Sequence, residues 1–358
     1  MTPPTSLRIV PELRAVHVER HRTGTPAELL YLDVNYDLAG TPLAEGIRRT
    51  TVGRALARFL HTTATTLEVP EPLWMRFWPK HAVLAAGFAL AGVVRGRRHR
   101  VVTYAMENND LRTLVGGRGR VPALLVTAVG LLVGVVARLT LDRIHFATPA
   151  ARNAYAQLPF VGAIEQTVGL ELPAPAPGPT RDAVPGSCVF VGVLEARKGI
   201  APLMSAWEVV ERTRPGAVLT IVGPGPELDR VRRWAAGAPD RRRVLGPLPH
   251  AEAGAAVARS AVLVAPSIPD GRWREQVGLP VKDALAAGLT VVATDQTGLA
   301  PWLAEHGHQV VTVAGGDLVG RLARSIERAV DTPLQREAVR AALPGRDGRM
   351  AADEWLHA

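Results

Sequence analysis

The chain has 358 residues, 47% of them hydrophobic, and its 42 Lys and Arg against 33 Asp and Glu give a net charge of +9. This length exceeds one ordinary core and fits two domains of roughly 150–180 residues, while the hydrophobic content excludes wholesale disorder. The single cysteine, Cys188, excludes an intramolecular disulfide framework and fits a reducing compartment. Because it lies in the apolar run CVFVGV, we expect a buried structural thiol.

The basic balance leaves three kinds of partner: nucleic acid, an anionic membrane surface, or a phosphate-bearing small molecule. Arginines cluster at 95–100, 117–120 and 241–243, but aromatic residues are only 5% and do not alternate with these clusters. A stacking surface for bases is therefore not supported, and we expect no nucleic-acid partner. Arginines that are simply solvated remain the alternative explanation. The N-terminus has no basic-then-apolar signal pattern, so we expect a cytoplasmic protein.

In the first half of the chain, strand-like apolar runs alternate with helical patterns. We expect strands at 28–35, 65–69, 100–106 and 143–148, and helices at 43–60, 78–95 and 121–140. This alternation is typical of the α/β class with mostly parallel sheets. We therefore assign residues 1–172 to an N-terminal Rossmann-like domain.

The uncharged segment 121–137 has 17 residues, which is the lower limit of the ~17–25 that a membrane-spanning helix needs. Strands are expected on both sides of it, and a crossing would place half of one sheet on each side of the bilayer. We therefore expect a buried core helix. Peripheral contact of this segment or of 82–94 with an anionic membrane surface, at the inner face of the cell membrane, stays open.

The prolines of the Pro/Ala-rich segment 173–187 cannot continue either a helical or a strand pattern, so this segment is predicted to be a linker. The alternation resumes after it, and we assign 188–340 to a second Rossmann-like domain. The last segment, 341–358, is expected to contain a helix that returns to the first domain. The expected strands of the second domain are 188–193, 217–223, 243–246, 261–267 and 290–295, with helices near 200–213, near 227–236 and from about 280.

Three turns in the second half are candidate ligand contacts. FVGVLEARKG (190–199) places Lys198 and Gly199 at the opening of a helix, where backbone amides and an ammonium favour a diphosphate; a solvated lysine is the alternative. LTIVGPGPELDRV (219–231) lacks the third glycine of a dinucleotide fingerprint, which argues against NAD. RVLGPLP (243–249) is a short strand and turn that could present backbone groups to a flat base.

The segment EQVGLPVKD (275–283) places carboxylates on both sides of a helix start. Pro280 suits the first helical position, and Gly278 allows a phosphate or sugar to approach closely. The backbone amides between the acids would face an anion. Glu275 and Asp283 cannot favour the phosphate, but they can accept hydrogen bonds from sugar hydroxyls.

Together these segments resemble the retaining glycosyltransferases of family 4, which have the GT-B fold of two Rossmann-like domains facing each other across a cleft. The resemblance rests on FVGVLEARKG, IVGPGP, VAPS and EQVGLPVKDALAAGLTVVATDQTGL, and covers about 188–330. Across 1–170 it is only architectural. It implies that the second domain, 188–340, binds a nucleotide sugar and that the first, 1–172, lies on the acceptor side.

The resemblance also implies roles for individual residues. Lys198 would contact the diphosphate, Glu275 the hydroxyls of the transferred sugar and Asp283 the ribose. The absence of any Asp-x-Asp motif agrees with transfer without a metal or other cofactor, in which amides and cationic side chains stabilise the leaving group. The remaining residues assigned to donor binding are Gly192, Val193, Arg197, Gly246, Leu248, Gln276, Val277, Gly278 and Leu279.

The chain departs from the family pattern at three places. Val193 stands where the family usually has Arg, and Asp283 stands in place of Glu. The family often has a histidine after the strand that ends at TYAMENND (103–110), and this chain has none. Glu107, which we assign as a catalytic residue, and Asn108 are the nearest substitutes; a polar loop is the alternative.

Two further segments of the first half are expected near the acceptor. Glu71 ends another strand, and the turn at 36–42 is a candidate glycine loop. The leading hypothesis is a metal-independent retaining transferase that moves a hexose-type sugar to a glycan, a lipid-linked acceptor or a small molecule. A non-catalytic nucleotide-sugar-binding protein on the same scaffold is the alternative.

Overall fold

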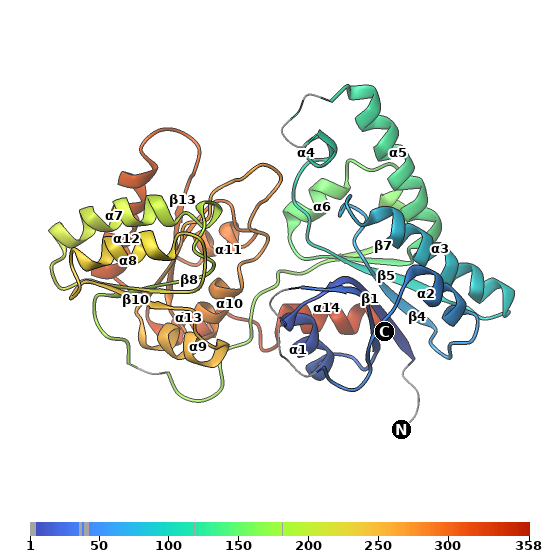
Figure 1. The fold of residues 1–358 in the computed structure, drawn as a ribbon, viewed down its shortest axis with the longest axis horizontal. Helices are drawn as coiled ribbons and strands as arrows, with labels where there is room; N and C mark the ends of the chain where they lie inside the picture. The colour runs from blue at the N-terminus through green and yellow to red at the C-terminus, as the bar shows by residue number, and fades with distance from the viewer. Residues whose placement is uncertain (1–4, 36–37, 39–42, 117–118, 120, 181) are drawn as a thin grey trace. The chain divides into compact units, whose positions relative to one another are not determined.

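The computed structural model describes residues 5–35, 38, 43–116, 119, 121–180 and 182–358, which divide into two compact units (Figure 1). Unit 1 contains Met1–Leu170 and Arg349–Ala358, and unit 2 contains Glu171–Gly348. Each unit holds one sheet whose paired strands are all parallel, with helices packed against it. The expected α/β class is confirmed.

The sheet of unit 1 has seven strands in the order β3-β2-β1-β4-β5-β6-β7. Its strands are β1 (Ser6–Leu13), β2 (Glu28–Val34), β3 (Ile47–Arg49), β4 (Thr66–Pro70), β5 (Arg100–Ala105), β6 (Arg143–Phe146) and β7 (Glu165–Val168). The sequence reading missed β1, β3 and β7. It missed the interior strand β1 because Arg8, Pro11 and Glu12 interrupt its apolar pattern.

The helices of unit 1 are α1 (Ala15–Thr23), α2 (Val52–Phe59), α3 (Trp78–Val94), α4 (Leu111–Gly116), α5 (Ala123–Thr140) and α6 (Pro149–Tyr155), with α14 (Gly348–His357) added from the end of the chain. The expectation of one helix over 43–60 was wrong. Its first part forms β3, and α2 begins only after Thr51, whose side chain accepts a hydrogen bond from Arg54 N.

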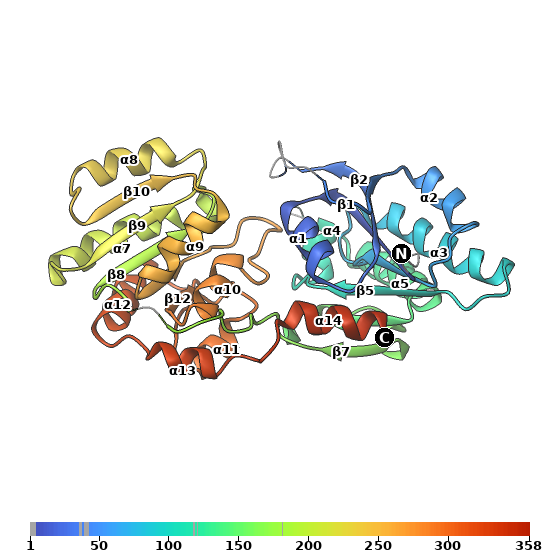
Figure 2. The same cartoon turned by 90° about the horizontal axis from the view of Figure 1, so that it is seen from below.

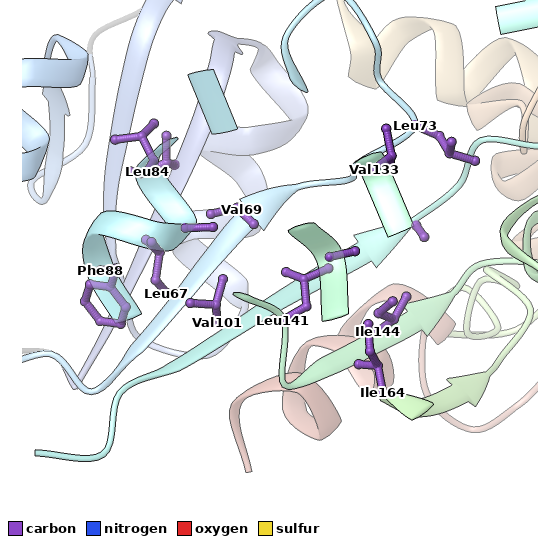
Figure 3. Packing of buried hydrophobic residues seen from close by; sticks show 14 of the residues in the cluster. Leu67, Val69, Leu73, Leu84, Phe88, Val101, Val133, Leu141, Ile144 and Ile164 are labelled. Carbon is purple, nitrogen blue, oxygen red and sulfur yellow. The ribbon is translucent and has the colours of Figure 1, made fainter. Parts of the chain in front are cut away.

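The core of unit 1 lies between the sheet and α3 and α5 (Figure 3). Leu67 and Val101 from neighbouring strands meet Phe88 of α3, and Val133 brings α5 into the same cluster. We expected α5 to be a buried core helix, and this expectation was wrong for one side of the helix, which is exposed. Its buried residues, Gly130, Val133, Gly134 and Ala137, occupy a single face, because a helix that covers a sheet contacts it along one stripe only.

A buried group of charges joins α14 to the first strands of unit 1. Arg8 of β1 donates to Glu68 at 2.9 Å and to Asp353 of α14 at 2.5 and 2.6 Å. Arg20 contacts the same two carboxylates, at 2.8 Å and 2.6 Å. Figure 2 shows α14 beside the sheet of unit 1. Apolar contacts add to this attachment, because Leu356 clusters with Val102 and Tyr104 of β5 and with Ala147, which directly follows β6.

Electrostatic pairing keeps the acids of this group ionised. Burial by itself would raise the pKa of Glu68, but Arg20, the hydrogen bond from His357, Arg349 and Arg8 hold it well below its usual range. Within the described residues, Glu68, Asp353 and His357 also lie close enough together to hold a metal ion. Arginine side chains already bind both carboxylates, so the cluster is an ion-pair network.

Removing Asp353 should destabilise unit 1, because Arg8 and Arg20 would lose a buried counter-charge. We expect Asp353→Ala to lower the free energy of unfolding by about 3–5 kcal/mol. Chemical denaturation followed by circular dichroism would measure the change. Glu19→Ala, at an exposed position of α1, is the control and should change stability by about 0.5 kcal/mol or less. Equal losses in the two variants would contradict the role given to the network.

The sheet of unit 2 has six strands in the order β10-β9-β8-β11-β12-β13. Its strands are β8 (Ser187–Val191), β9 (Val218–Val222), β10 (Arg242–Gly246), β11 (Val262–Ala265), β12 (Thr290–Thr294) and β13 (Gln309–Val311). Its helices are α7 (Ile200–Thr213), α8 (Leu228–Ala236), α9 (His250–Arg259), α10 (Leu279–Ala286), α11 (Ala300–Glu305), α12 (Leu318–Asp331) and α13 (Arg336–Ala341). Cys188 is fully buried in β8, as expected, and burial raises the pKa of its thiol to about 12.

The Pro-rich segment 173–187 packs along unit 2, and among its described residues only Ser187, the first residue of β8, belongs to a helix or strand. Ala176 N donates to Ala286 O at 2.9 Å, and Val184 N donates to Arg259 O at 3.1 Å. Beside it, Lys282 of α10 forms ion pairs with Glu171 at 3.2 Å and with Asp347 at 2.9 Å. Both ends of unit 2 are therefore tied to α10.

Candidate functional site

The candidate site of unit 2 lies where the strand order of its sheet reverses. β8 pairs with β9 on one side and with β11 on the other. Because all paired strands are parallel, the loops that follow them gather at the carboxyl edge of the sheet, where α/β proteins place their ligands. The loops after β8, β10 and β11 contain most of the residues assigned to donor binding, whereas Gly246 ends β10, and Leu279 and Asp283 lie in α10.

Lys198 and Glu275 meet at this edge. Lys198 lies in a short 3-10 helix, Ala196–Lys198, after β8, and its Nζ forms an ion pair with Glu275 Oε2 from the loop after β11. Ser267 Oγ donates to the same oxygen at 3.0 Å. Both charged side chains keep about a fifth of their surface exposed, 19% for Lys198 and 17% for Glu275. The site thus offers a cation and a carboxylate side by side, both accessible to a ligand.

Trp273 contacts both Arg197 and Lys198, so Arg197 also lies near the Lys198–Glu275 pair. The Arg197 guanidinium lies 4.3 Å from the centroid of the Trp273 ring, and Lys198 Nζ lies 5.0 Å from it. Arg197 also pairs with Glu195. Two cations therefore contact one aromatic ring. Sequence reasoning missed Trp273 and Ser267 as site residues, although Ser267 belongs to the VAPS segment that it quoted.

Two glycines let the loops approach one another at this edge. A Cβ on Gly223, whose φ is +138°, would stand 1.9 Å from Gly192 O. A Cβ on Gly199, with φ +71°, would stand 1.9 Å from Pro266 O. Because no side chain fits at either position, the motif glycines after β8 and β9 are required by backbone packing as well as by any ligand.

The segment from Gln276 to Leu279 leads into α10, which begins at Leu279 with Gly278 as its N-cap at a positive φ of +84°. Its carbonyls are anchored: Gly298 N donates to Gln276 O at 2.9 Å, and Thr297 Oγ1 donates to Val277 O at 2.8 Å. Val277 is buried, and Leu279 is exposed.

The other assigned donor residues surround this centre. Pro280 occupies the second helical position of α10, one later than expected, and Asp283 lies half-buried in the next turn. Gly246 accepts a hydrogen bond from Gly223 N at 2.8 Å. Val193 and Leu248 are half-buried. The assignments of all these residues to donor binding stay predictions.

The acids of unit 1 form a separate buried cluster at the carboxyl ends of β4 and β5. Glu71 accepts hydrogen bonds from Met106 N at 3.0 Å, from Glu107 N at 3.0 and 3.1 Å, and from Tyr155 OH at 2.9 Å. The Glu107 carboxylate accepts from Asn109 N at 2.9 Å and from its Nδ2 at 2.8 Å. The Glu107 side chain therefore stabilises the loop in which it lies, and its catalytic assignment stays a prediction.

Burial, together with the nearby charge of Glu107, raises the pKa of Glu71 to about 8. Sequence reasoning named Glu71 only as a residue facing a ligand, and it missed Tyr155 because that side chain comes from α6, 84 residues away. Of the candidate loop at 36–42, only residue 38 lies within the described residues. Leu38 packs with Leu29 and Tyr31 of β2.

The raised pKa of Glu71 predicts a dependence of stability on pH. A carboxyl whose pKa rises from 4.5 to about 8 on folding stabilises the fold fully below pH 4.5, and this contribution is lost as the pH rises through about 8. We expect the melting temperature of the wild type to fall from about pH 5 to about pH 9 relative to Glu71→Gln, which stays neutral. Glu19→Gln, on an exposed position of unit 1, should keep the wild-type slope. Parallel curves for the wild type and Glu71→Gln would contradict the assignment.

Comparison with known proteins gives a family for unit 2. Residues 185–332 match the family described as glycosyl transferases group 1. A glycogen synthase of Mycobacterium tuberculosis is 34% identical over 162 residues, which are 43% of this chain and 36% of that protein. A GDP-mannose-dependent alpha-(1-6)-phosphatidylinositol monomannoside mannosyltransferase of the same species is 31% identical over 176 residues, which are 48% of this chain and 42% of the relative. The match thus spans less than half the length of these relatives.

The fold likeness extends over nearly the whole chain. The crystal structure of HepE from Anabaena in complex with UDP covers 98% of this chain and 95% of its own, with a TM-score of 0.62 and 12% identity. At this identity the likeness concerns the fold alone. It agrees with two parallel α/β sheets of seven and six strands in one chain.

Proposed function

Because this chain belongs to the glycosyl transferases group 1 family (family 4), with the GT-B fold, we propose that it is a retaining glycosyltransferase that uses a nucleoside-diphosphate sugar. One observation carries the proposal: the paired Lys198 and Glu275 lie at the carboxyl edge of a parallel sheet, where its strand order reverses. A cation and a carboxylate side by side suit a ligand that carries both phosphates and hydroxyls. A diphosphate sugar has both.

In the proposed complex, Lys198 contacts the diphosphate. Arg197, whose guanidinium also contacts the Trp273 ring, adds a second positive charge nearby. The backbone amides from Gln276 to Leu279 face the phosphates. Glu275 accepts hydrogen bonds from the transferred sugar, and Asp283 accepts them from the ribose. The position of Arg197 supports this arrangement despite Val193, since a second cation lies close to Lys198.

The proposed reaction breaks the bond between the anomeric carbon and the diphosphate oxygen. An acceptor hydroxyl forms the new bond on the face that the diphosphate leaves, so the configuration is retained, and its proton passes to the departing phosphate oxygen. Negative charge develops on the leaving diphosphate in the transition state. Lys198 and the fixed amides stabilise that charge where it develops, which accelerates the step.

The donor class can be tested first by thermal shift of the purified chain against UDP, GDP, ADP and TDP without added metal. A diphosphate that binds the folded protein specifically should add about 2.7 kcal/mol of stability at 100 times its Kd. We expect one nucleotide to raise the melting temperature clearly. A screen in which no nucleotide shifts the curve would contradict the proposed donor site.

Glu275→Gln should separate catalysis from binding. The amide keeps the size of the side chain but removes the charge beside Lys198 and weakens acceptance from the sugar hydroxyls. We expect turnover of the donor sugar to fall at least about 100-fold while the Kd for the nucleotide changes less than about tenfold. Glu305→Gln, at an exposed position of unit 2, is the control. If the wild type binds nucleotide but has no turnover, the chain is instead a non-catalytic nucleotide-sugar-binding protein.

We propose a glycan or a lipid-linked molecule as the acceptor. A lipid acceptor is supported by the relative from Mycobacterium tuberculosis whose name includes a phosphatidylinositol mannoside. A cytoplasmic protein that uses such an acceptor would work at the inner face of the cell membrane. Assays of donor transfer should therefore include lipid extracts as well as soluble glycans.

A further inference from the structure

Helix α5 exposes an apolar side that no described residue of unit 1 covers. The helix has 18 residues with a mean hydropathy of 2.2, long and apolar enough to cross a membrane by length and composition, yet only 22% of it is buried. Its exposed large side chains are 48% to 81% accessible: Leu124, Leu125, Leu131, Leu132 and Leu139. Side chains of this size rarely face water in such number on one helix, so the surface is a candidate for binding.

Helix α3 extends this surface. It packs against α5 (Figure 1), and its own exposed apolar side chains, Val83, Leu90, Val93 and Val94, are 50% to 76% accessible. They recur at helical spacing, so they lie on the outer side of α3 while Leu84 and Phe88 face the core. We call the exposed apolar residues of both helices the α3/α5 face.

Positive charge borders the α3/α5 face. Between residues 78 and 140 the sequence holds nine basic residues and two acidic ones, Glu107 and Asp110, and Glu107 is buried. Arg97 and Arg98 are exposed just after α3, and Arg138 is exposed in the last turn of α5. The two helices connect successive parallel strands and run in the same direction, which places these arginines toward the same edge of the sheet.

We propose that the α3/α5 face docks unit 1 peripherally on an anionic lipid bilayer, with its leucines and valines in the interface and its arginines on the headgroups. An apolar helix side bordered by cations has the composition of an interfacial helix. A second copy of this chain suits the surface less well, because it would bring the same arginines to the contact. This inference rests on the proposed use of a lipid-linked acceptor, but membrane docking itself requires no glycosyl transfer.

The packing of α5 favours lying on the bilayer over crossing it. A Cβ added at Gly134 would stand 2.2 Å from Pro159 O, so the helix backbone approaches the segment after α6 closely. Val133 and Ala137 belong to the core of unit 1. Withdrawing α5 into a bilayer would expose that core and remove the helix that connects β5 to β6.

Flotation of the full chain with lipid vesicles tests the proposal. We expect co-flotation with phosphatidylcholine vesicles that contain phosphatidylglycerol, and at least about tenfold less with pure phosphatidylcholine. Leu125→Glu/Leu132→Glu should reduce binding to the anionic vesicles by about tenfold or more. Arg97→Glu/Arg98→Glu should remove the preference for anionic lipid. Leu125→Ser/Leu132→Ser is a milder pair that tests the apolar contribution without a new charge.

The matched control is Val34→Glu/Val184→Glu, because these valines are 48% and 59% exposed and lie outside the face. It should float as the wild type does. No flotation of the wild type, or equal losses in the control, would overturn the proposal. So would a dimer in light scattering that Leu125→Glu/Leu132→Glu abolishes, since that result assigns the face to a second copy. Nucleotide thermal shifts measured on the same variants should be unchanged, so failure of docking and failure of the donor site are distinguishable.

Discussion

Parallel strand pairing is the constraint on which the rest of this structure depends. When every strand of a sheet points the same way, each connection must return across a face, and each loop that follows a strand emerges at one edge. In unit 2 this brings Lys198 from the loop after β8 to Glu275 from the loop after β11. The glycines after β8 and β9 then allow neighbouring loops to touch through backbone atoms. The pairing of a cation with a carboxylate follows from this geometry, and the proposed binding of a nucleotide sugar rests on that pairing.

Unit 1 buries carboxyl groups by two different physical means. Glu68 and Asp353 stay ionised because arginines from β1 and α1 surround them, and this network also attaches the end of the chain. Glu71 has amide and hydroxyl donors in place of cations, and its pKa is raised. The first arrangement favours the charged acid through opposite charges, whereas desolvation of the second favours the neutral acid. Glu68 and Glu71 lie only three positions apart in the sequence, so the neighbouring residues could not show which of them is ionised and which has a raised pKa.

The helices of unit 1 also divide their surfaces between two environments. α5 contacts the core through small residues and Val133, which permits close approach, and presents leucines outward. Hydrophobic composition predicts burial of a helix correctly on average, but it does not say which side is covered or by what. Among the described residues of unit 1, the sheet, α3 and α4 cover one side of α5 only. In the proposed docking, a lipid surface would supply the apolar environment for the other side.

The sequence by itself determined the α/β class, most strands of unit 2 and the segments from which its site is built, because apolar periodicity and glycine-rich turns are local signals. It did not reveal β1, since a strand with a buried arginine looks polar until Glu68 and Asp353 are placed beside it. It also did not reveal the contacts of Trp273 with Arg197 and Lys198, or of Tyr155 with Glu71. Only the tertiary structure decided these pairings, because they join residues far apart in the chain through sheet order and helix packing, which no local pattern encodes.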